Sequence, residues 1–325
     1  MAAIRRIERD CAGQVWKPAI QQTWKSALRG GAVCRASDGE GELSSEVRAG
    51  TRSELAWERA VEARTALREC RLCAHQCRVN RLAGELGQCH AGPEARVFST
   101  QVEVGDELEL IPTFAIALSG CDLRCDFCLT GASSWNPGAG APVAPKVLGE
   151  RARVALADGA RTVMLLGGEP TIHLPAALEI VAALPAEATL VWKTNAHGSV
   201  EARGWLEGLF DVWLADYKFG NDGCALRLAG IRNYGGVVRE NLIWAAQRSE
   251  LIVRHLLMPG HGECCWRPVA EWLAAELPGV KVSLRAEFWP TWHAARHVEL
   301  RHLPGVQERA RAVELGTALG LNLIP

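Results

Sequence analysis

Six short runs of apolar, β-branched and aromatic residues alternate with amphipathic helical segments beyond Leu110, and this alternation constrains the fold most strongly. Strands separated by helices pair in parallel and are covered by those helices. The sequence therefore predicts an α/β fold, a partial (β/α)6 barrel, in which ligands bind at the carboxyl ends of the strands. The expected strands are Phe114–Leu118, Thr162–Leu166, Thr189–Thr194, Asp211–Asp216, Leu251–Leu257 and Lys281–Ala286.

Two further parts precede the predicted barrel of residues 111–325. Residues 1–52 mix glycine, serine and charged residues without lasting periodicity, so we expect a tail or extension of low order. Residues 53–110 begin with apolar residues at helical spacing and continue with a cysteine-rich stretch. We expect a helix from Ser53 that leads into a small cysteine-rich appendage.

Composition limits the partners and the compartment. The formal net charge is −1 and no basic block is present, which argues against a nucleic-acid groove. The first residues lack the apolar core of a signal peptide, and no run is long enough to span a membrane. A cytoplasmic protein with no membrane partner is therefore expected, in which twelve cysteines indicate metal binding rather than disulfides.

Three cysteines in the run CDLRCDFC follow the first predicted strand: Cys121, Cys125 and Cys128. A cubane 4Fe-4S cluster needs four ligands, so three thiolates leave one iron open to a small molecule, and such a cluster donates single electrons at low potential. The alternative is a structural zinc site, which usually has four protein ligands in paired knuckles. Because the run supplies three cysteines and no partner pair follows it, we favour the cluster.

The second predicted strand runs directly into Gly167, Gly168 and Glu169. Glycines let a backbone come close to a ligand, and a carboxylate accepts hydrogen bonds from an amine. The alternative is an ordinary turn between a strand and a helix.

The next two strands also end in polar residues. The third ends in Lys193, Thr194 and Asn195, and the fourth leads into Asp216 and Lys218. Lys218 would suit a ligand carboxylate or ribose, and Asp216 a cation or hydroxyl. The alternative for Asp216 and Lys218 is an exposed ion pair at the rim of the barrel.

This order of motifs, CxxxCxxC, GGEP, a Thr-Asn strand end, DYK and VRHLLMPG, resembles the radical S-adenosylmethionine (SAM) superfamily. It is most similar to the branch around pyruvate formate-lyase activating enzyme that carries cysteines ahead of the barrel. The resemblance implies a radical SAM barrel, a 4Fe-4S cluster on the three cysteines, and SAM on its open iron. It places Glu169 at the amino group of SAM, Phe127 near the adenine, and Arg254 inside the barrel. The chain departs from the activating enzymes at Lys193, where they have an aspartate.

The function implied by the resemblance is that of a radical SAM oxidoreductase. Reductive cleavage of SAM gives a 5'-deoxyadenosyl radical, which abstracts hydrogen from a protein, peptide or small-molecule substrate. A low-potential electron donor of the flavodoxin or ferredoxin type is the implied partner. One alternative is an activase of a glycyl-radical enzyme; another is a non-enzymatic iron-sulfur or zinc protein.

A second group of cysteines lies ahead of the barrel: Cys70, Cys73, Cys77 and Cys89. Four thiols so close in sequence indicate a metal site. A structural zinc would stiffen a small appendage, whereas a compact run with one remote cysteine is more typical of an auxiliary 4Fe-4S cluster, which we favour. The neighbouring His75 and His90 are expected at the surface or beside the ligands.

Three more cysteines follow the fourth and fifth predicted strands: Cys224, Cys264 and Cys265. They should therefore lie on the same face as the SAM site. We expect them, with Arg254, to take part in substrate chemistry, as reactive thiols or as ligands of another metal; buried, inert thiols are the alternative. His261, beside the cysteine pair, is a candidate base or ligand. Cys11 and Cys34, in the tail, have no expected role.

Overall fold

The computed structural model describes residues 42–105 and 107–325. Most of the predicted tail, with Cys11 and Cys34, lies outside the described residues. The helix predicted from Ser53 is present but begins earlier, because α1 spans Glu42–Ala66. Its buried face consists of small residues, Ala56, Ala60 and Ala63, whereas Trp57 and Val61 are more than half exposed. α1 therefore packs closely through alanines, and Trp57 and Val61 face outward.

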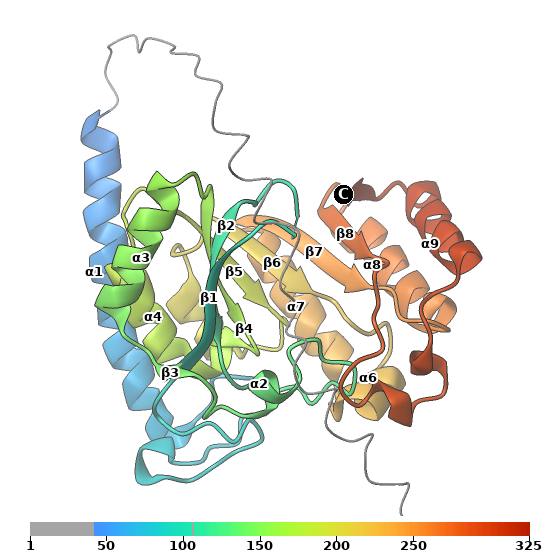
Figure 1. The fold of residues 1–325 in the computed structure, drawn as a ribbon, viewed down its shortest axis with the longest axis horizontal. Coiled ribbons are helices and arrows are strands. Elements are labelled where there is room, and N and C mark those ends of the chain that lie inside the picture. The colour runs from blue at the N-terminus through green and yellow to red at the C-terminus, as the bar shows by residue number, and fades with distance from the viewer. Residues whose placement is uncertain (1–41, 106) are drawn as a thin grey trace, which may run out of the picture. The chain divides into compact units, whose positions relative to one another are not determined.

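The described strands form one sheet in the order β3-β1-β2-β4-β5-β6-β7-β8-β9 (Figure 1). From β2 to β9 every neighbouring pair is parallel, which confirms the partial barrel. The six predicted strands correspond to β2, β4, β5, β6, β7 and β8, with each end within one residue of the prediction. Their bounds are β2 Thr113–Leu118, β4 Thr162–Gly167, β5 Thr189–Thr194, β6 Val212–Asp216, β7 Glu250–Leu256 and β8 Lys281–Arg285.

Three strands were not predicted from the sequence. β1, Arg96–Glu103, pairs antiparallel with β2 and lies within the segment that the sequence analysis assigns to the appendage. The short β3, Ala141–Pro142, pairs with β1, and β9, Asn322–Ile324, extends the parallel sheet beyond β8. The predicted appendage therefore contains a strand that is part of the barrel sheet.

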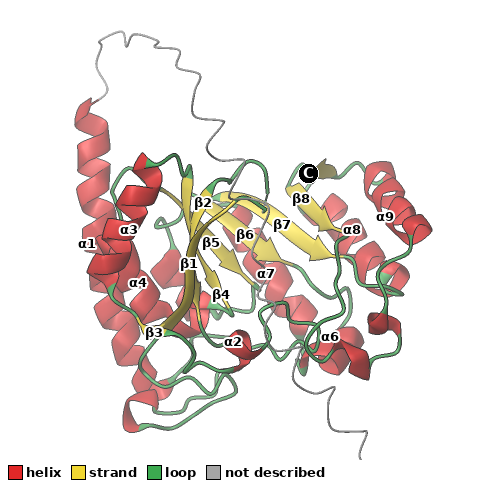
Figure 2. Ribbon diagram, in the orientation of Figure 1, coloured by secondary structure: helices red, strands yellow, loops and turns green. Residues whose placement is uncertain are grey.

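The helices flank the sheet, with α3 and α4 at its left in the view and α8 and α9 at its right (Figure 2). Local capping fixes several of their starts; for example, the Ser199 side chain accepts a hydrogen bond from the Ala202 amide at the start of α5. None of the helices within 42–105 and 107–325 is both long and apolar enough to cross a lipid bilayer. Their bounds are α2 Ala132–Trp135, α3 Pro145–Ala157, α4 Leu174–Ala183, α5 Val200–Leu206, α6 Asp222–Ala229, α7 Tyr234–Ala246, α8 Arg267–Glu276 and α9 Val306–Ala318.

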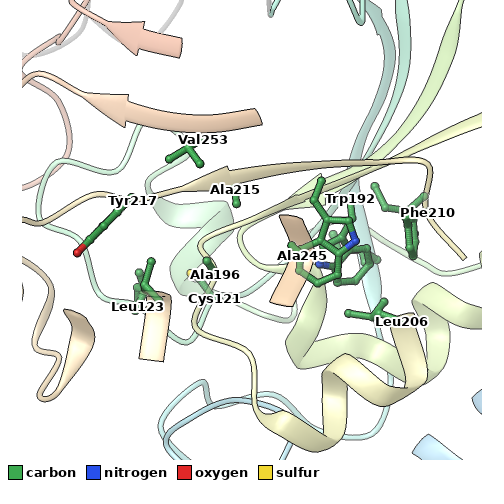
Figure 3. Close-up of a cluster of buried hydrophobic side chains, with 14 of the residues drawn as sticks. Cys121, Leu123, Trp192, Ala196, Leu206, Phe210, Ala215, Tyr217, Ala245 and Val253 are labelled. Atoms are coloured by element: carbon green, nitrogen blue, oxygen red, sulfur yellow. The ribbon is translucent and has the colours of Figure 1, made fainter. Parts of the chain in front are cut away.

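Side chains alternate between the two faces of the strands. On β5, Trp192 points to the helices, where its ring lies 4.9 Å from that of Phe210 (Figure 3). Its neighbour Val191 belongs to a smaller apolar cluster inside the barrel, with Met164 of β4 and Leu214 of β6. Above this inner cluster, the last inward-facing residues of β4 to β8 line a cavity: Leu166, Lys193, Asp216, Leu256 and Arg285.

The loop after β2, residues 119–131, is called the cysteine loop below. Cys121 and Leu123 of this loop are part of the main buried cluster, together with Trp192 and Phe210 (Figure 3). Backbone hydrogen bonds also tie the loop to the end of α6, since the amides of Arg124 and Asp126 donate to the carbonyls of Ala229 and Leu228. The core of the barrel thus fixes the position of the cysteines.

Candidate functional site

A cavity of about 270 Å³ opens at the carboxyl ends of the parallel strands. The sequence predicts the ligand site at these strand ends, and eleven of the predicted site residues line the cavity. Those residues are Cys121, Cys125, Phe127, Cys128, Gly167, Gly168, Thr194, Asn195, Asp216, Lys218 and Arg254. The structure therefore brings together residues from five separate strand ends.

The three cysteines of the cysteine loop share this cavity, and no fourth cysteine of the described chain lines it. Cys121 and Cys125 are buried, whereas Cys128 is partly exposed. Burial raises the pKa of Cys121 well above its ordinary value and that of Cys125 to about 12. Buried thiols of this kind become thiolates when a metal compensates their charge. A set of three sulfur ligands on one cavity wall fits a cluster that keeps one iron open.

Gly168 brings the end of β4 against the cysteine loop. A Cβ atom at Gly168 would lie 1.7 Å from the carbonyl oxygen of Gly120 and 3.3 Å from the amide nitrogen of Cys121. The Glu169 amide donates to the same Gly120 oxygen at 2.9 Å. The sequence predicts close approach of a ligand at this glycine; in the structure Gly168 also leaves room for the backbone that carries Cys121.

Glu169 is buried beneath the cavity and does not line it. Its Oε1 accepts hydrogen bonds from the amide and hydroxyl of Thr171 and from the hydroxyl of Thr194, and its Oε2 accepts one from the Asn195 amide. Burial and the charge of Asp122 raise the pKa of Glu169 to about 7. The Glu169 carboxyl group thus joins the turn after β4 to the end of β5. Its direct contact with SAM stays a prediction.

A buried network that was missed in the sequence lies beside Cys121. Asp122 Oδ2 accepts a hydrogen bond from His197 Nδ1 at 2.8 Å, and its Oδ1 accepts one from Asn195 Nδ2 at 2.7 Å. His75 Nε2 lies 3.1 Å from the Asp122 carbonyl oxygen. Burial alone would raise the pKa of Asp122, but His197 and Asn195 hold it below its ordinary value. Asp122 lies between the motif cysteines, yet its partner is far away in sequence, so spacing did not reveal it.

Cationic side chains dominate the charged lining of the cavity. Lys193, Lys218, Arg254 and Arg285 all line the cavity, against one carboxylate, Asp216. Lys218 Nζ lies 2.5 Å from Asp216 Oδ2. Burial disfavours both charges, but the partner charge together with other nearby charges outweighs it, so the pKa of Asp216 is lowered and that of Lys218 is raised.

Arg254 points into the barrel, as predicted, and a second carboxylate supports it there. Arg254 Nε lies 3.4 Å from Oε1 of Glu107, which also accepts a hydrogen bond from the hydroxyl of Ser283. Glu107 and Arg285 were missed from the sequence, although Arg285 lies one residue before the end of the predicted strand Lys281–Ala286 and is the last residue of β8.

The N-terminal cysteines lie against the barrel near the cysteine loop. Cys70, Cys73 and Cys89 are buried and Cys77 is exposed. Cys73 forms an isolated bridge with Gly198, in the turn after β5. The buried Arg81 reaches this group, with Nη1 3.8 Å from Cys70 Sγ.

The other three predicted cysteines come together, but not in the cavity. Cys224, Cys264 and Cys265 lie with His261 so that their ligand atoms are within 4.8 Å of one another. None of the four residues lines the cavity of the cysteine loop. The sequence correctly placed these cysteines on neighbouring loops, whereas their separation from the cavity was not foreseen.

Residues 116–273 match the family model of the radical SAM superfamily. An uncharacterized protein from Methanocaldococcus jannaschii, MJ0674, is 30% identical over 275 residues, which cover 81% of this chain and 78% of that protein.

Solved structures of Streptococcus suis SuiB are also similar. SuiB bound to the precursor peptide SuiA has 15% sequence identity and a TM-score of 0.47, and SuiB bound to S-adenosylmethionine has 15% identity and a TM-score of 0.48. These matches cover 62% and 63% of this chain, and the chain spans about half the length of SuiB, 46% and 47%. The family model matches the part of the barrel that carries the cysteine loop and the strand ends around the cavity, so the chain belongs to the radical SAM superfamily.

Proposed function

We propose that this chain binds SAM in the cavity beside the cysteine loop and cleaves it reductively, to oxidise a substrate by hydrogen abstraction. The observation that carries the proposal is the common cavity of Cys121, Cys125, Cys128 and the polar strand ends. Membership of the superfamily implies a 4Fe-4S cluster and SAM. When bound, the cluster supplies one electron that breaks a carbon–sulfur bond of SAM and yields a 5'-deoxyadenosyl radical. A flavodoxin- or ferredoxin-type donor provides the electron in this proposal.

The charged wall of the cavity suits the charges of the proposed ligands. Lys218 and Asp216 form one pair of opposite charges at the end of β6, which matches a ligand with both a carboxylate and cationic groups. Three further cationic side chains line the cavity, Lys193, Arg254 and Arg285, and their positive charges favour the thiolate form of the three cysteines. We assign Lys218 to the carboxylate of SAM.

The apolar part of the site is suited to an adenine ring. Phe127 is buried at the cavity wall, with its ring 6.0 Å from that of Phe219 and 6.3 Å from that of Phe288. These neighbours hold the ring in one orientation, so that a flat base can pack against its open side. We therefore place the adenine of SAM at Phe127.

Two buried carboxyl groups act by holding the site in place. Glu169 fixes Thr194 and Asn195 at the end of β5, and both of these residues line the cavity. Asp122 fixes the Asn195 side chain beside Cys121, at 3.7 Å from its sulfur. The spacing between cysteine loop and strand ends thus depends on side chains beneath the cavity.

We also propose that the N-terminal cysteines hold a second 4Fe-4S cluster. Three of the four thiols are buried in one small segment, and a guanidinium approaches one of them. Buried thiolates with a nearby cation are typical of metal ligation. Zinc on the same four sulfurs is the alternative.

An electron paramagnetic resonance (EPR) experiment tests the binding of SAM. The full chain, reconstituted anaerobically with iron and sulfide and then reduced by dithionite, should show a cluster signal that changes when SAM is added. The Cys70, Cys73 and Cys77 to alanine variant should retain this SAM-dependent change, since it keeps the cysteine loop. A signal that SAM leaves unaltered in both proteins would overturn the proposal.

A further inference from the structure

We propose that Cys224, His261, Cys264 and Cys265 form a closed binding site for one zinc ion. This site is separate from the cavity of the cysteine loop and does not depend on the function proposed above. Three thiols and one imidazole are a ligand set typical of structural zinc.

The distances between the ligand atoms fit a single tetrahedral ion. Cys264 Sγ lies 3.8 Å from Cys224 Sγ and 4.0 Å from Cys265 Sγ. His261 Nδ1 lies 3.3 Å from Cys264 Sγ, 3.4 Å from Cys265 Sγ and 3.7 Å from Cys224 Sγ. With Zn–S about 2.3 Å and Zn–N about 2.0 Å, a tetrahedron has edges of about 3.8 Å between sulfurs and about 3.5 Å between sulfur and nitrogen.

The same distances argue against a disulfide and against an iron-sulfur cluster at these four residues. A disulfide has an S–S length of about 2.05 Å, so Cys224 and Cys264 are not bonded to each other at 3.8 Å. In a 4Fe-4S cluster each cysteine binds a different iron, so four ligand atoms gathered around one point suit a single ion instead.

The chain around the four residues is built to hold them close. The π-helix Gly262–Trp266 follows His261 and carries both Cys264 and Cys265. Asn221 joins this segment to α6: its Oδ1 accepts a hydrogen bond from the Cys224 amide at 2.8 Å, and its Nδ2 donates one to the Cys264 carbonyl at 2.7 Å. π-Helical turns are rare and are often found at functional sites.

Gly220 permits the close contact between the two segments. A Cβ atom there would lie 2.3 Å from the carbonyl oxygen and 2.7 Å from the Cα of Cys265. A larger residue would therefore push the segment after β6 away from the π-helix.

The imidazole is placed to bind through Nδ1, which faces the sulfurs. Its Nε2 lies 3.7 Å from Oε1 of Glu299 and 3.2 Å from Nη2 of Arg227. A metal-bound histidine commonly donates its other N–H to a carboxylate, and Glu299 is the acceptor in reach. Arg227 is itself a hydrogen-bond donor and cannot accept a hydrogen bond from the Nε2–H group. Metal binding should therefore move its guanidinium away from Nε2, while its contact with Glu299 remains.

Burial indicates a structural rather than a catalytic site. Cys224, His261 and Cys265 are at most 9% exposed, and the four side chains complete a tetrahedron without an open position. The ion would link the segments after β6 and β7, which directly follow Lys218 and Leu256 of the cavity wall. Zinc here would thus stabilise the wall on which the SAM site depends.

Metal analysis of matched variants tests this inference. Wild-type full chain, purified with zinc and iron available, should contain one more zinc per chain than Cys264→Ala, with the same amount of iron. Cys34→Ala, which also removes one cysteine but not one of these ligands, should keep the wild-type zinc content. Equal zinc in Cys264→Ala and Cys34→Ala, or loss of iron instead of zinc from Cys264→Ala, would overturn the inference.

Zinc X-ray absorption of the wild-type protein gives a test that needs no variant. A first shell that contains sulfur at about 2.3 Å and an imidazole nitrogen at about 2.0 Å supports the site. A shell of sulfur alone, or no bound zinc, contradicts it even if Cys264→Ala fails to fold.

Discussion

Oε2 of Glu169 lies 2.7 Å from the amide nitrogen of Asn195, and this hydrogen bond joins the turn after β4 to the end of β5. The other carboxylate oxygen accepts from Thr171 and Thr194. A carboxyl group that was expected to bind the cofactor therefore holds the backbone that surrounds it. Its ionisation should affect the stability of the whole site.

Replacement of Glu169 by glutamine should remove part of the pH dependence of stability. The folded chain holds the Glu169 proton up to about pH 7, whereas an ordinary glutamate loses it near 4.5. Because the folded state binds more protons in this window, stability falls as pH rises from 4.5 to 7, by about 3 kcal/mol for this group. Urea unfolding of the metal-free chain at several pH values should show this fall in wild type and a smaller one in Glu169→Gln. Glu240→Gln, on the exposed face of α7, should follow wild type; parallel curves for all three proteins would refute the prediction.

Gly168→Ala should destabilise the chain and disrupt the cluster site. The added Cβ would meet the Gly120 carbonyl at 1.7 Å, so the β4 turn or the cysteine loop must move. We expect a loss of about 3 kcal/mol in urea unfolding, at the upper end of overpacking costs. Gly204→Ala, at an exposed helical position with nothing within 4 Å of the new Cβ, is the control and should be neutral or stabilising. Equal stability of the two variants would contradict the close packing of these loops.

Lys218→Met should weaken SAM binding without loss of the iron-sulfur cluster. The substitution removes a charged hydrogen-bond donor worth about 1.5–3 kcal/mol, which corresponds to roughly a ten- to hundredfold rise in the dissociation constant. Equilibrium dialysis of the reconstituted protein with labelled SAM measures the change. Lys146→Met, on the exposed side of α3, should bind like wild type. Unchanged affinity in Lys218→Met would show that another group neutralises the SAM carboxylate.

The triple alanine variant at Cys121, Cys125 and Cys128 should still bind about four irons after anaerobic reconstitution, if the N-terminal cysteines hold a second cluster. Iron and sulfide analysis, with the wild-type protein as reference, should give roughly half of the wild-type content. Zinc in place of iron in the variant would reject the second cluster.

The sequence predicted the parallel strands because each is a compact apolar run between helices. β1 was missed because its residues are half-buried or exposed, so they show neither a continuous apolar run nor clean alternation, and β9 has only three residues. The site was predictable where one motif carries it, as for Cys121 to Cys128. The site could not be predicted where contacts join distant loops. His197 and Asp122 lie 75 positions apart in the sequence, and His261 joins the cysteine group only through the fold.

Formation of 5'-deoxyadenosine is the most direct test of the central claim. The full chain, reconstituted anaerobically and supplied with dithionite and SAM, should release 5'-deoxyadenosine and methionine. The triple alanine variant at Cys121, Cys125 and Cys128, treated identically, should release neither above background. Wild-type protein with its full iron content that forms no 5'-deoxyadenosine, or a triple variant as active as wild type, would contradict the assignment of SAM cleavage to the cysteine loop.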